Sequence, residues 1–181
     1  GKIVGWFSGR MEFGPRALGG RSILANPKLL GMKDKINREV KHRESWRPFA
    51  PTVLKEYAHE YFERYHPSPF MLLTFHTKPE KISDIQAAVH VDGTARVQEI
   101  DRESHPRYYE LIDEFRKLTG IPVVLDTSFN DREKPICNTP RDAVQTFYST
   151  GLDVLGLEDF ILEKEEGSAS TRDAPTLPRT S

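Results

Sequence analysis

The fold is decided by residues 106–130, which read PRYYELIDEFRKLTGIPVVLDTSFN. The first half predicts a helix over residues 107–119, with apolar residues on one face, a proline at its entrance and a glycine at its exit. These residues are Leu111, Ile112, Phe115, Leu118, Pro106 and Gly120. The second half predicts a buried strand, 122–125, that runs directly into a polar stretch, 126–130.

Strand and helix signals continue to alternate on both sides of this stretch. Apolar or alternating runs predict strands at residues 3–7, 22–25, 70–75, 95–100, 154–157 and 160–164. Periodicity and capping signals predict helices at 32–41, at 56–62, and between Thr139 and Gly151. Pro48 and Pro51 make 46–53 an edge or irregular strand. The alternation predicts an α/β domain with a mixed sheet over residues 1–166, followed by a flexible tail, 167–181, that carries no chemistry.

Length, hydrophobic content and cysteine usage restrict the class of protein. With 181 residues, 37% of them hydrophobic, the chain is long enough for one globular domain with its own core. Cys137 is the single cysteine, and its neighbours offer no base, which predicts a packed thiol in a reducing compartment such as the cytoplasm. No apolar run approaches the roughly 20 residues of a membrane helix. A start at Gly1, in a strand candidate and without Met, predicts a fragment of a longer protein.

Charge is distributed unevenly along the chain. The 26 Lys and Arg residues nearly balance the 27 Asp and Glu residues, but residues 1–55 hold 12 basic and 4 acidic side chains. Their arginines stand among glycines and prolines, which let backbone approach a ligand closely and hold guanidinium forks toward phosphate or carboxylate oxygens. This pattern predicts a site for a polyanionic small molecule. The alternative is a solvated basic face, which would be typical of lysines scattered among glutamates on helices.

Four segments carry the candidate site residues. A rigid turn at 14–19 presents Arg16, with Arg10 and Arg21 nearby; a predicted helix end carries Lys41 and Arg43; a strand start carries Arg96; and Thr127, Ser128 and Asn130 follow the buried strand. Ligands of α/β sheets bind at the carboxyl ends of strands, where this last group would lie. Each segment has a simpler reading: Lys41 and Arg43 as partners of a helix dipole, Arg96 as a surface ion-pair partner, and Ser128 and Asn130 as turn formers.

Taken together, the runs 9–24, 41–51, 90–98 and 127–130 resemble the C-terminal domain of the O-carbamoyltransferases that act on nodulation factors, cephamycins and tobramycin-like aminoglycosides. The resemblance spans residues 1 to about 164 and implies the YrdC-like fold, a twisted open mixed sheet with flanking helices and a basic concave face. Relatives with that fold carry Lys-x-Arg and Ser-x-Asn signatures, which match Lys41-x-Arg43 and Ser128-x-Asn130 here. Asp126 departs from the family, which usually has Asn there, and an inward-facing carboxylate would repel a phosphate.

The resemblance implies that the domain takes carbamoyl phosphate and ATP, with Mg²⁺ held by the triphosphate, and yields carbamoyl adenylate and pyrophosphate. Lys41, Arg43 and Arg96 would be catalytic, and Arg16, Arg21, Thr127, Ser128 and Asn130 would bind the nucleotide. A preceding actin-like-ATPase domain, absent from this chain, would move the carbamoyl group to a hydroxyl of a sugar, antibiotic or nodulation factor. Preplaced cations suit this chemistry because charge builds up on the phosphoryl oxygens. We therefore expect Arg16, Lys41, Arg96 and Asn130 to border one cavity.

Other functions stay open at this point. A YrdC-like module that binds RNA or nucleotides without catalysis would also present a basic face, although a net charge of −1 argues against nucleic acid. A non-catalytic remnant of a longer enzyme is the third alternative. No His, Cys or carboxylate cluster has the spacing of a metal site, and none is expected to bind a dedicated metal ion.

Overall fold

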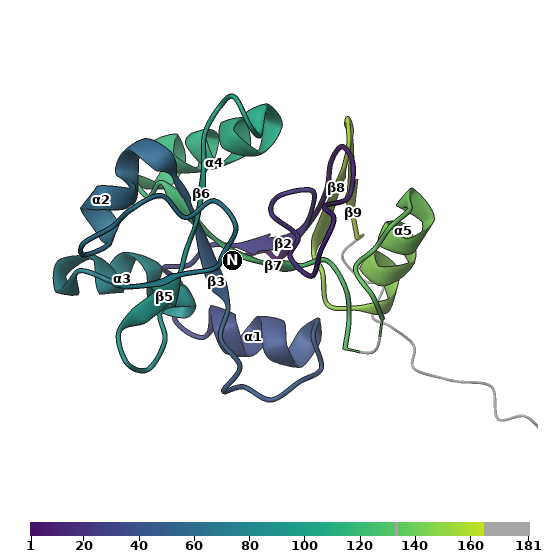
Figure 1. Cartoon of the computed structure of the whole chain (residues 1–181). Coiled ribbons are helices and arrows are strands. Elements are labelled where there is room, and N and C mark those ends of the chain that lie inside the picture. The colour runs from purple at the N-terminus through teal and green to yellow at the C-terminus, as the bar shows by residue number, and fades with distance from the viewer. Residues whose placement is uncertain (133, 165–181) are drawn as a thin grey trace, which may run out of the picture.

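A computed structural model describes residues 1–132 and 134–164, and within them the chain folds around a seven-stranded mixed sheet (Figure 1). The strand order is β6-β3-β7-β2-β1-β8-β9, with β3–β6 and β1–β8 parallel and the other neighbours antiparallel. The strands are β1 (Val4–Phe7), β2 (Arg21–Ala25), β3 (Ala50–Leu54), β6 (Gln98–Ile100), β7 (Val123–Ser128), β8 (Val154–Leu157) and β9 (Phe160–Glu163). A separate antiparallel pair joins β4 (Thr74–His76) to β5 (Thr94–Arg96).

Helices cover both faces of the large sheet. Figure 1 shows α4 on one side and α1 on the other. The α-helices are α1 (Met32–Glu39), α2 (Ala58–Tyr61), α3 (Ile82–Ile85), α4 (Pro106–Thr119) and α5 (Pro140–Ser149). Short 3₁₀ turns occupy Lys55–Tyr57, Pro79–Lys81 and Gln86–Ala88. Helices α4 and α5 begin or end where the sequence predicts, because Pro106, Gly120 and the capping box of Thr139 with Asp142 mark the ends.

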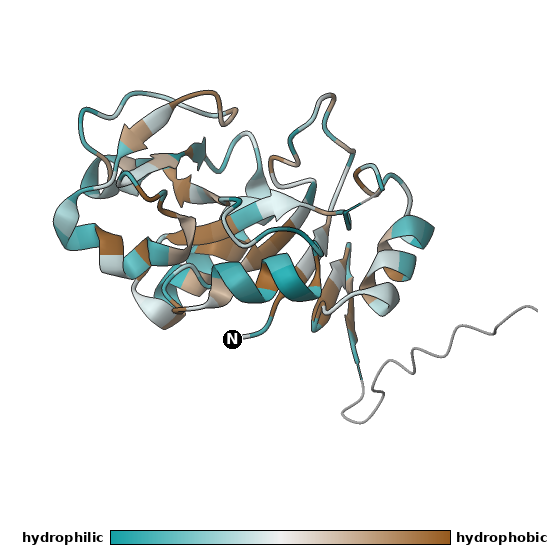
Figure 2. Cartoon of the chain, turned by 90° about the horizontal axis from the view of Figure 1, so that it is seen from below, coloured by the Kyte–Doolittle hydropathy of each residue, from teal (hydrophilic) through white to brown (hydrophobic). Residues whose placement is uncertain are grey.

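The core is divided among these layers. One apolar cluster joins α1 and α5 to the sheet through residues such as Ile36, Leu125 and Phe147. A second packs α4 against the opposite face through Ile112 and Val124, and a third fills the space among α2, α3, β4 and β5. In Figure 2 the apolar residues gather on the strands, whereas α1 turns hydrophilic residues outward.

The predicted YrdC-like α/β fold is confirmed, but several predicted elements are corrected. The strand at 70–75 is wrong up to Leu73: Met71 adopts a left-handed φ of 53°, Phe70 and Leu72 are exposed, and β4 begins only at Thr74. The strand at 95–100 divides at Val97 into β5 and β6, which belong to different sheets. Leu118 points to solvent rather than to the core of α4.

Two further corrections concern the site. The stretch at 46–53 gives β3, an inner strand rather than an edge, and Pro51 is accommodated because pairing with β6 starts at Thr52. Helix α1 ends at Glu39, two residues earlier than predicted, so Lys41 lies beyond the helix. The predicted boundary at 166 and the tail at 167–181 lie outside the described residues. Within the described residues, no helix combines the length and the apolar composition required to cross a membrane.

Candidate functional site

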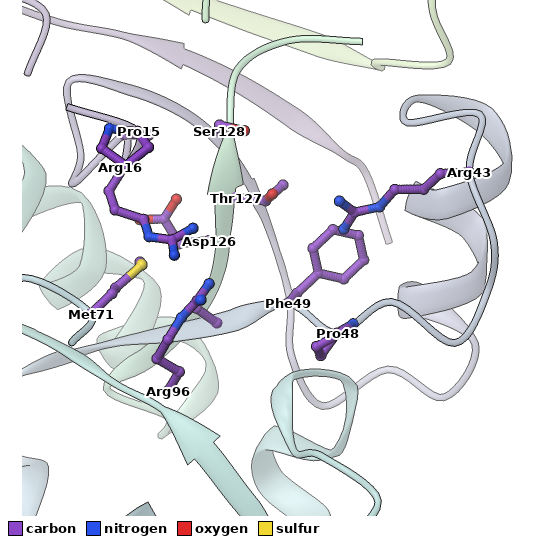
Figure 3. Close-up of a pocket in the computed structure, with 12 residues that line it drawn as sticks. Pro15, Arg16, Arg43, Pro48, Phe49, Met71, Arg96, Asp126, Thr127 and Ser128 are labelled. Carbon is purple, nitrogen blue, oxygen red and sulfur yellow. The ribbon is translucent and has the colours of Figure 1, made fainter. Parts of the chain in front are cut away.

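The carboxyl end of β7 borders adjoining pockets, which we call the arginine pocket and the lysine pocket. The arginine pocket encloses about 120 Å³ (Figure 3). Its lining residues are Pro15, Arg16, Ala17, Arg43, Pro48, Phe49, Ala50, Met71, Arg96, Asp126, Thr127 and Ser128. The lysine pocket encloses about 180 Å³ and is lined by Lys41, Arg43, Glu44, Arg47, Ser128, Asn130, Asp131 and Arg132. Arg43 and Ser128 line both pockets, so the two spaces meet at these side chains.

Three guanidinium groups from separate elements face the arginine pocket. Figure 3 shows Arg16, from the loop between β1 and β2, pointing toward Arg96 at the end of β5, with Arg43 on the other side. Within residues 1–132 and 134–164, none of these arginines forms an ion pair with a carboxylate. Burial lowers the pKa of Arg96, and the charge of Arg16 lowers it further. An anion in the pocket would relieve this repulsion between like charges.

Arg43 is held in place by Asn37, in the last turn of α1, and by Phe49. Its Nε donates to Oδ1 of Asn37 at 2.7 Å, and its guanidinium lies over the ring of Phe49, 4.9 Å from the centroid. The Asn37 amide in turn donates to the carbonyl of Arg47 at 3.1 Å, which fixes the chain leading into β3. Burial, followed by the charge of Arg47, lowers the pKa of Arg43. The hydrogen bond between Asn37 and Arg43 was not predicted, because no sequence motif indicates that an asparagine in the last turn of a helix will orient a nearby arginine.

Lys41 is almost fully buried and acts on the turn that follows β7. Its Nζ donates to the carbonyl oxygens of Ser128 (2.5 Å) and Asn130 (3.0 Å) and to Oδ1 of Asn130 (2.8 Å), with Oγ of Ser128 at 3.4 Å. Burial, with a smaller contribution from the charge of Arg43, lowers the pKa of Lys41 to about 7. The ammonium therefore joins the two predicted signatures physically: Lys41 holds the Ser128–Asn130 segment across 87 and 89 residues of sequence.

The glycine-rich loop between β1 and β2 is fastened by Arg21, which lies outside both pockets. Its guanidinium donates to the carbonyl oxygens of Gly20 (2.8 Å), Gly9 (3.0 Å) and Ser8 (3.2 Å), and stacks on Phe7 with 3.4 Å to the ring centroid. These contacts explain why a charged side chain is 4% exposed at this position. The interpretation of Arg21 as a nucleotide ligand is corrected: the structure gives it a role in shaping the loop that carries Arg16.

Asp126, on β7, lines the arginine pocket. Its Oδ2 accepts hydrogen bonds from Tyr108 (2.8 Å) and Thr52 (2.9 Å). This carboxylate oxygen is therefore hydrogen-bonded to buried side chains of the core. Burial raises the pKa of Asp126 to about 6, and these hydrogen bonds oppose that rise. Thr52 lies on β3, which pairs with β7, and Tyr108 lies on α4, so these partners come from separate elements that the sequence did not bring together.

The expectation that Arg16, Lys41, Arg96 and Asn130 all border one cavity is wrong: they are divided between the two adjoining pockets. Arg16, Arg96 and Thr127 border the arginine pocket, whereas Lys41 and Asn130 border the lysine pocket. Sequence reasoning also missed Met71, which has no polar signal, and Phe49, which stands between two prolines. Cys137 lies in neither pocket: it is buried, with Sγ 3.4 Å from Oγ1 of Thr146, and burial raises its pKa. Among the described residues, no group of three or more His, Cys, Asp or Glu side chains could hold a metal ion.

Residues 1–164 match the family described as Carbamoyltransferase C-terminus. The chain is 46% identical to nodulation protein NolNO of Sinorhizobium fredii, covering 98% of this chain and 27% of that protein. It is also 46% identical to nodulation protein NolO of Bradyrhizobium diazoefficiens, with 93% and 31% covered. The uncharacterized protein sll1178 of Synechocystis is 45% identical, with 91% and 30% covered. The chain therefore spans about 30% of the length of these relatives.

A solved structure shares the fold. Full-length HypF in its phosphate- and nucleotide-bound form aligns with a TM-score of 0.57 and 22% identity. The alignment covers 86% of this chain and 19% of HypF. At this level of identity the likeness establishes the arrangement of strands and helices.

Proposed function

The chain belongs to the Carbamoyltransferase C-terminus family, and on this premise we propose that it binds carbamoyl phosphate and ATP at the arginine and lysine pockets and forms carbamoyl adenylate. The observation that carries the proposal is the convergence of Arg16, Arg43 and Arg96 on one small pocket without a carboxylate ion-pair partner among the described residues. Guanidinium groups left unpaired at a pocket favour phosphate oxygens, which accept paired hydrogen bonds from their forks.

The proposed reaction needs two steps to balance. Water first cleaves carbamoyl phosphate to carbamate and inorganic phosphate. A carbamate oxygen then attacks the α-phosphate of ATP, a new P–O bond forms, and pyrophosphate leaves with the electron pair of the bond that breaks. Negative charge on the phosphoryl oxygens is greatest during this second step, where fixed cations stabilise it most.

The residues divide this work by position. Arg16 and Arg96 would bind the phosphate of carbamoyl phosphate, and Arg43, which lines both pockets, would face the α-phosphate. Lys41 keeps the Ser128–Asn130 segment in place, and Thr127 offers a hydroxyl to the nucleotide. Mg²⁺ would bind together with ATP and be held by the triphosphate oxygens, because Mg²⁺ commonly takes substrate phosphates and few protein groups as ligands.

Transfer of the carbamoyl group belongs to the second part of the proposal. Relatives such as NolO are about three times as long as this chain, so most of each relative lies outside the matched segment. We assign the final transfer to a hydroxyl to an actin-like-ATPase domain in that remaining part.

The proposal is tested by incubating the 181-residue chain with ATP, Mg²⁺ and carbamoyl phosphate and measuring pyrophosphate. Release should depend on carbamoyl phosphate and fall about tenfold to a hundredfold in Arg96→Ala, because a charge-assisted contact is lost. Arg38→Ala is the charge-matched control, since Arg38 is an exposed α1 residue paired with Glu39. Pyrophosphate release that ignores carbamoyl phosphate, or that survives in Arg96→Ala, would contradict the proposal.

A further inference from the structure

Arg96 lies where the two sheets of the molecule meet. It pairs with Thr74 at the end of the small β4–β5 sheet, and two residues later Gln98 pairs with Thr52 in the large sheet. Val97 alone separates the two strands. Because neither sheet holds the chain on both sides of this junction, the direction of the Arg96 side chain depends on what fastens the residues that follow it.

The loop between α2 and β4 fastens this junction. The buried Ser68 donates from its hydroxyl to the carbonyl oxygen of Val97 at 3.0 Å. The carbonyl oxygen of Ser68 accepts from the backbone N–H of Glu99, also at 3.0 Å. From the same loop, the Tyr65 hydroxyl donates to Oε2 of Glu99 at 2.7 Å. Hydrogen bonds from one loop therefore hold the stretch directly after Arg96.

The hydrogen bond between Tyr65 and Glu99 is closed to solvent, since each residue is 7% exposed. Burial, followed by the hydrogen bond and the charge of Glu99, raises the pKa of Tyr65, so its phenol stays protonated and donates. The Tyr65 ring also packs on Phe75, with 4.7 Å between centroids, and Phe75 pairs with Ala95. Tyr65 thus contacts the structure on both sides of Arg96. Without the hydroxyl, the buried Glu99 carboxyl would lose this donor.

The guanidinium of Arg96 has no side-chain partner of its own to orient it. In the part of the chain that the structure describes, its buried Nε has no hydrogen-bond partner and no carboxylate lies within ion-pair distance. Arg43 differs in this respect, because Asn37 and Phe49 hold its guanidinium. The direction of Arg96 is therefore set by its backbone.

We propose that Tyr65 and Glu99 are positioning residues for Arg96, which aim its guanidinium into the arginine pocket through the backbone of residues 97–99. The inference rests on the proposed function, in which Arg96 binds the phosphate of carbamoyl phosphate. Figure 3 shows the guanidinium groups of Arg96 and Arg16 in the same pocket, and the charge of Arg16 opposes this placement. The backbone must hold Arg96 against this repulsion until an anion enters.

The test measures carbamoyl-phosphate-dependent pyrophosphate release by Tyr65→Phe, which removes the hydroxyl and keeps the ring. The KM for carbamoyl phosphate should rise about tenfold while the KM for ATP stays unchanged, because one binding group is misplaced. Tyr61→Phe is the matched control: Tyr61 is a buried tyrosine of the same apolar cluster, with its ring 4.8 Å from Nζ of Lys81. Glu99→Gln keeps an acceptor for the Tyr65 hydroxyl and should raise the KM less than Glu99→Leu. A wild-type KM in Tyr65→Phe would overturn the inference.

Two further measurements separate positioning from a general loss of stability. A residue that acts through Arg96 has no effect once Arg96 is gone, so adding Tyr65→Phe to Arg96→Ala should not raise the KM further; additive effects would overturn the inference. The NMR signal of the Arg96 Nε–H should move or broaden in Tyr65→Phe and stay in place in Tyr61→Phe. If the wild-type chain releases no pyrophosphate, the proposed function fails, and the NMR comparison alone decides whether Tyr65 orients Arg96: an unmoved signal in Tyr65→Phe means that it does not.

Discussion

At the scale of single residues, the site depends on charged side chains that are buried and held in place by hydrogen bonds. Lys41 shows this most clearly, because its ammonium is surrounded by oxygens of Ser128 and Asn130 rather than aimed into the arginine pocket. The Lys-x-Arg and Ser-x-Asn patterns could be picked out in the sequence. That the lysine of one pattern holds the serine and asparagine of the other could not, since the contact spans 87 residues and depends on α1 ending at Glu39.

Replacing Lys41 by Met should therefore loosen the segment after β7 as well as remove a charge. We expect about a tenfold to hundredfold loss of carbamoyl-phosphate-dependent pyrophosphate release, which corresponds to the loss of one charge-assisted interaction worth about 1.5–3 kcal/mol. Hydrogen exchange of the Phe129 and Asn130 amides should accelerate in the same variant. Lys117→Met, at an exposed α4 lysine, is the control. Wild-type activity and exchange in Lys41→Met would show that Lys41 is dispensable.

Asp126 gives a prediction about pH. Its pKa in the fold is about 6, above the 3.8 of an ordinary aspartate, so the folded state binds a proton more readily than the unfolded state between these values. The carboxylate therefore lowers stability as pH rises from 4 to above 6. Asp126→Asn should be more stable than wild type by about 2–3 kcal/mol at pH 7.5, and the difference should shrink toward zero near pH 4. Urea unfolding at the two pH values measures it; an equal difference at both would exclude the buried charge as its cause.

At the scale of elements, local signals predicted the long helices well and the short strands less well. Helix α4 lies between Pro106 and Gly120, and α5 starts at the Thr139 cap, because capping is decided by neighbours in sequence. The apolar run at 70–75 looked like a strand, but Phe70, Leu72 and Leu73 are exposed and Met71 turns the chain. Whether an apolar run forms a strand depends on pairing with a strand that is distant in sequence. Local composition does not predict that pairing.

The glycine-rich loop between β1 and β2 offers an element-scale test. Gly19 has a φ of +95°, and a Cβ there would lie 2.2 Å from the Tyr108 ring, the same tyrosine that bonds Asp126. Gly9 also has a positive φ, of +62°, but its Cβ would meet open space. Gly9→Ala should cost about 1–2 kcal/mol from backbone strain. Gly19→Ala should cost clearly more, because the Tyr108 ring must also move, and should lower acyl phosphate affinity. Equal losses of unfolding free energy in the two variants would argue against the clash.

At the scale of the whole molecule, charge and fold agree on where the chemistry lies. Arg16, Lys41 and Arg43 come from the basic first 55 residues, and the sheet places them beside β7 and Arg96, more than 50 residues away along the chain. The sequence predicted this convergence through the resemblance and the order of its motifs. It did not predict the division into adjoining pockets or the place of Arg21, which depend on the paths of the loops.

The division of labour between this chain and the rest of its relatives leads to the last prediction. The pockets carry the cations to which we assign adenylate formation, while the chain spans about 30% of the relatives it matches. If the proposed function holds, carbamoyl adenylate made by the 181-residue chain alone should be hydrolysed by water, since shielding from solvent is what preserves such intermediates. Chromatography should show AMP accumulating in step with pyrophosphate, dependent on carbamoyl phosphate and reduced about tenfold to a hundredfold in Arg96→Ala. Cys137→Ser, at a thiol outside both pockets, should behave as wild type. Adding an aminoglycoside or a nodulation factor should change neither product, because we assign the transfer step to a part of the longer relatives outside the matched segment. A stable O-carbamoyl product from these 181 residues would instead place the whole reaction within this domain.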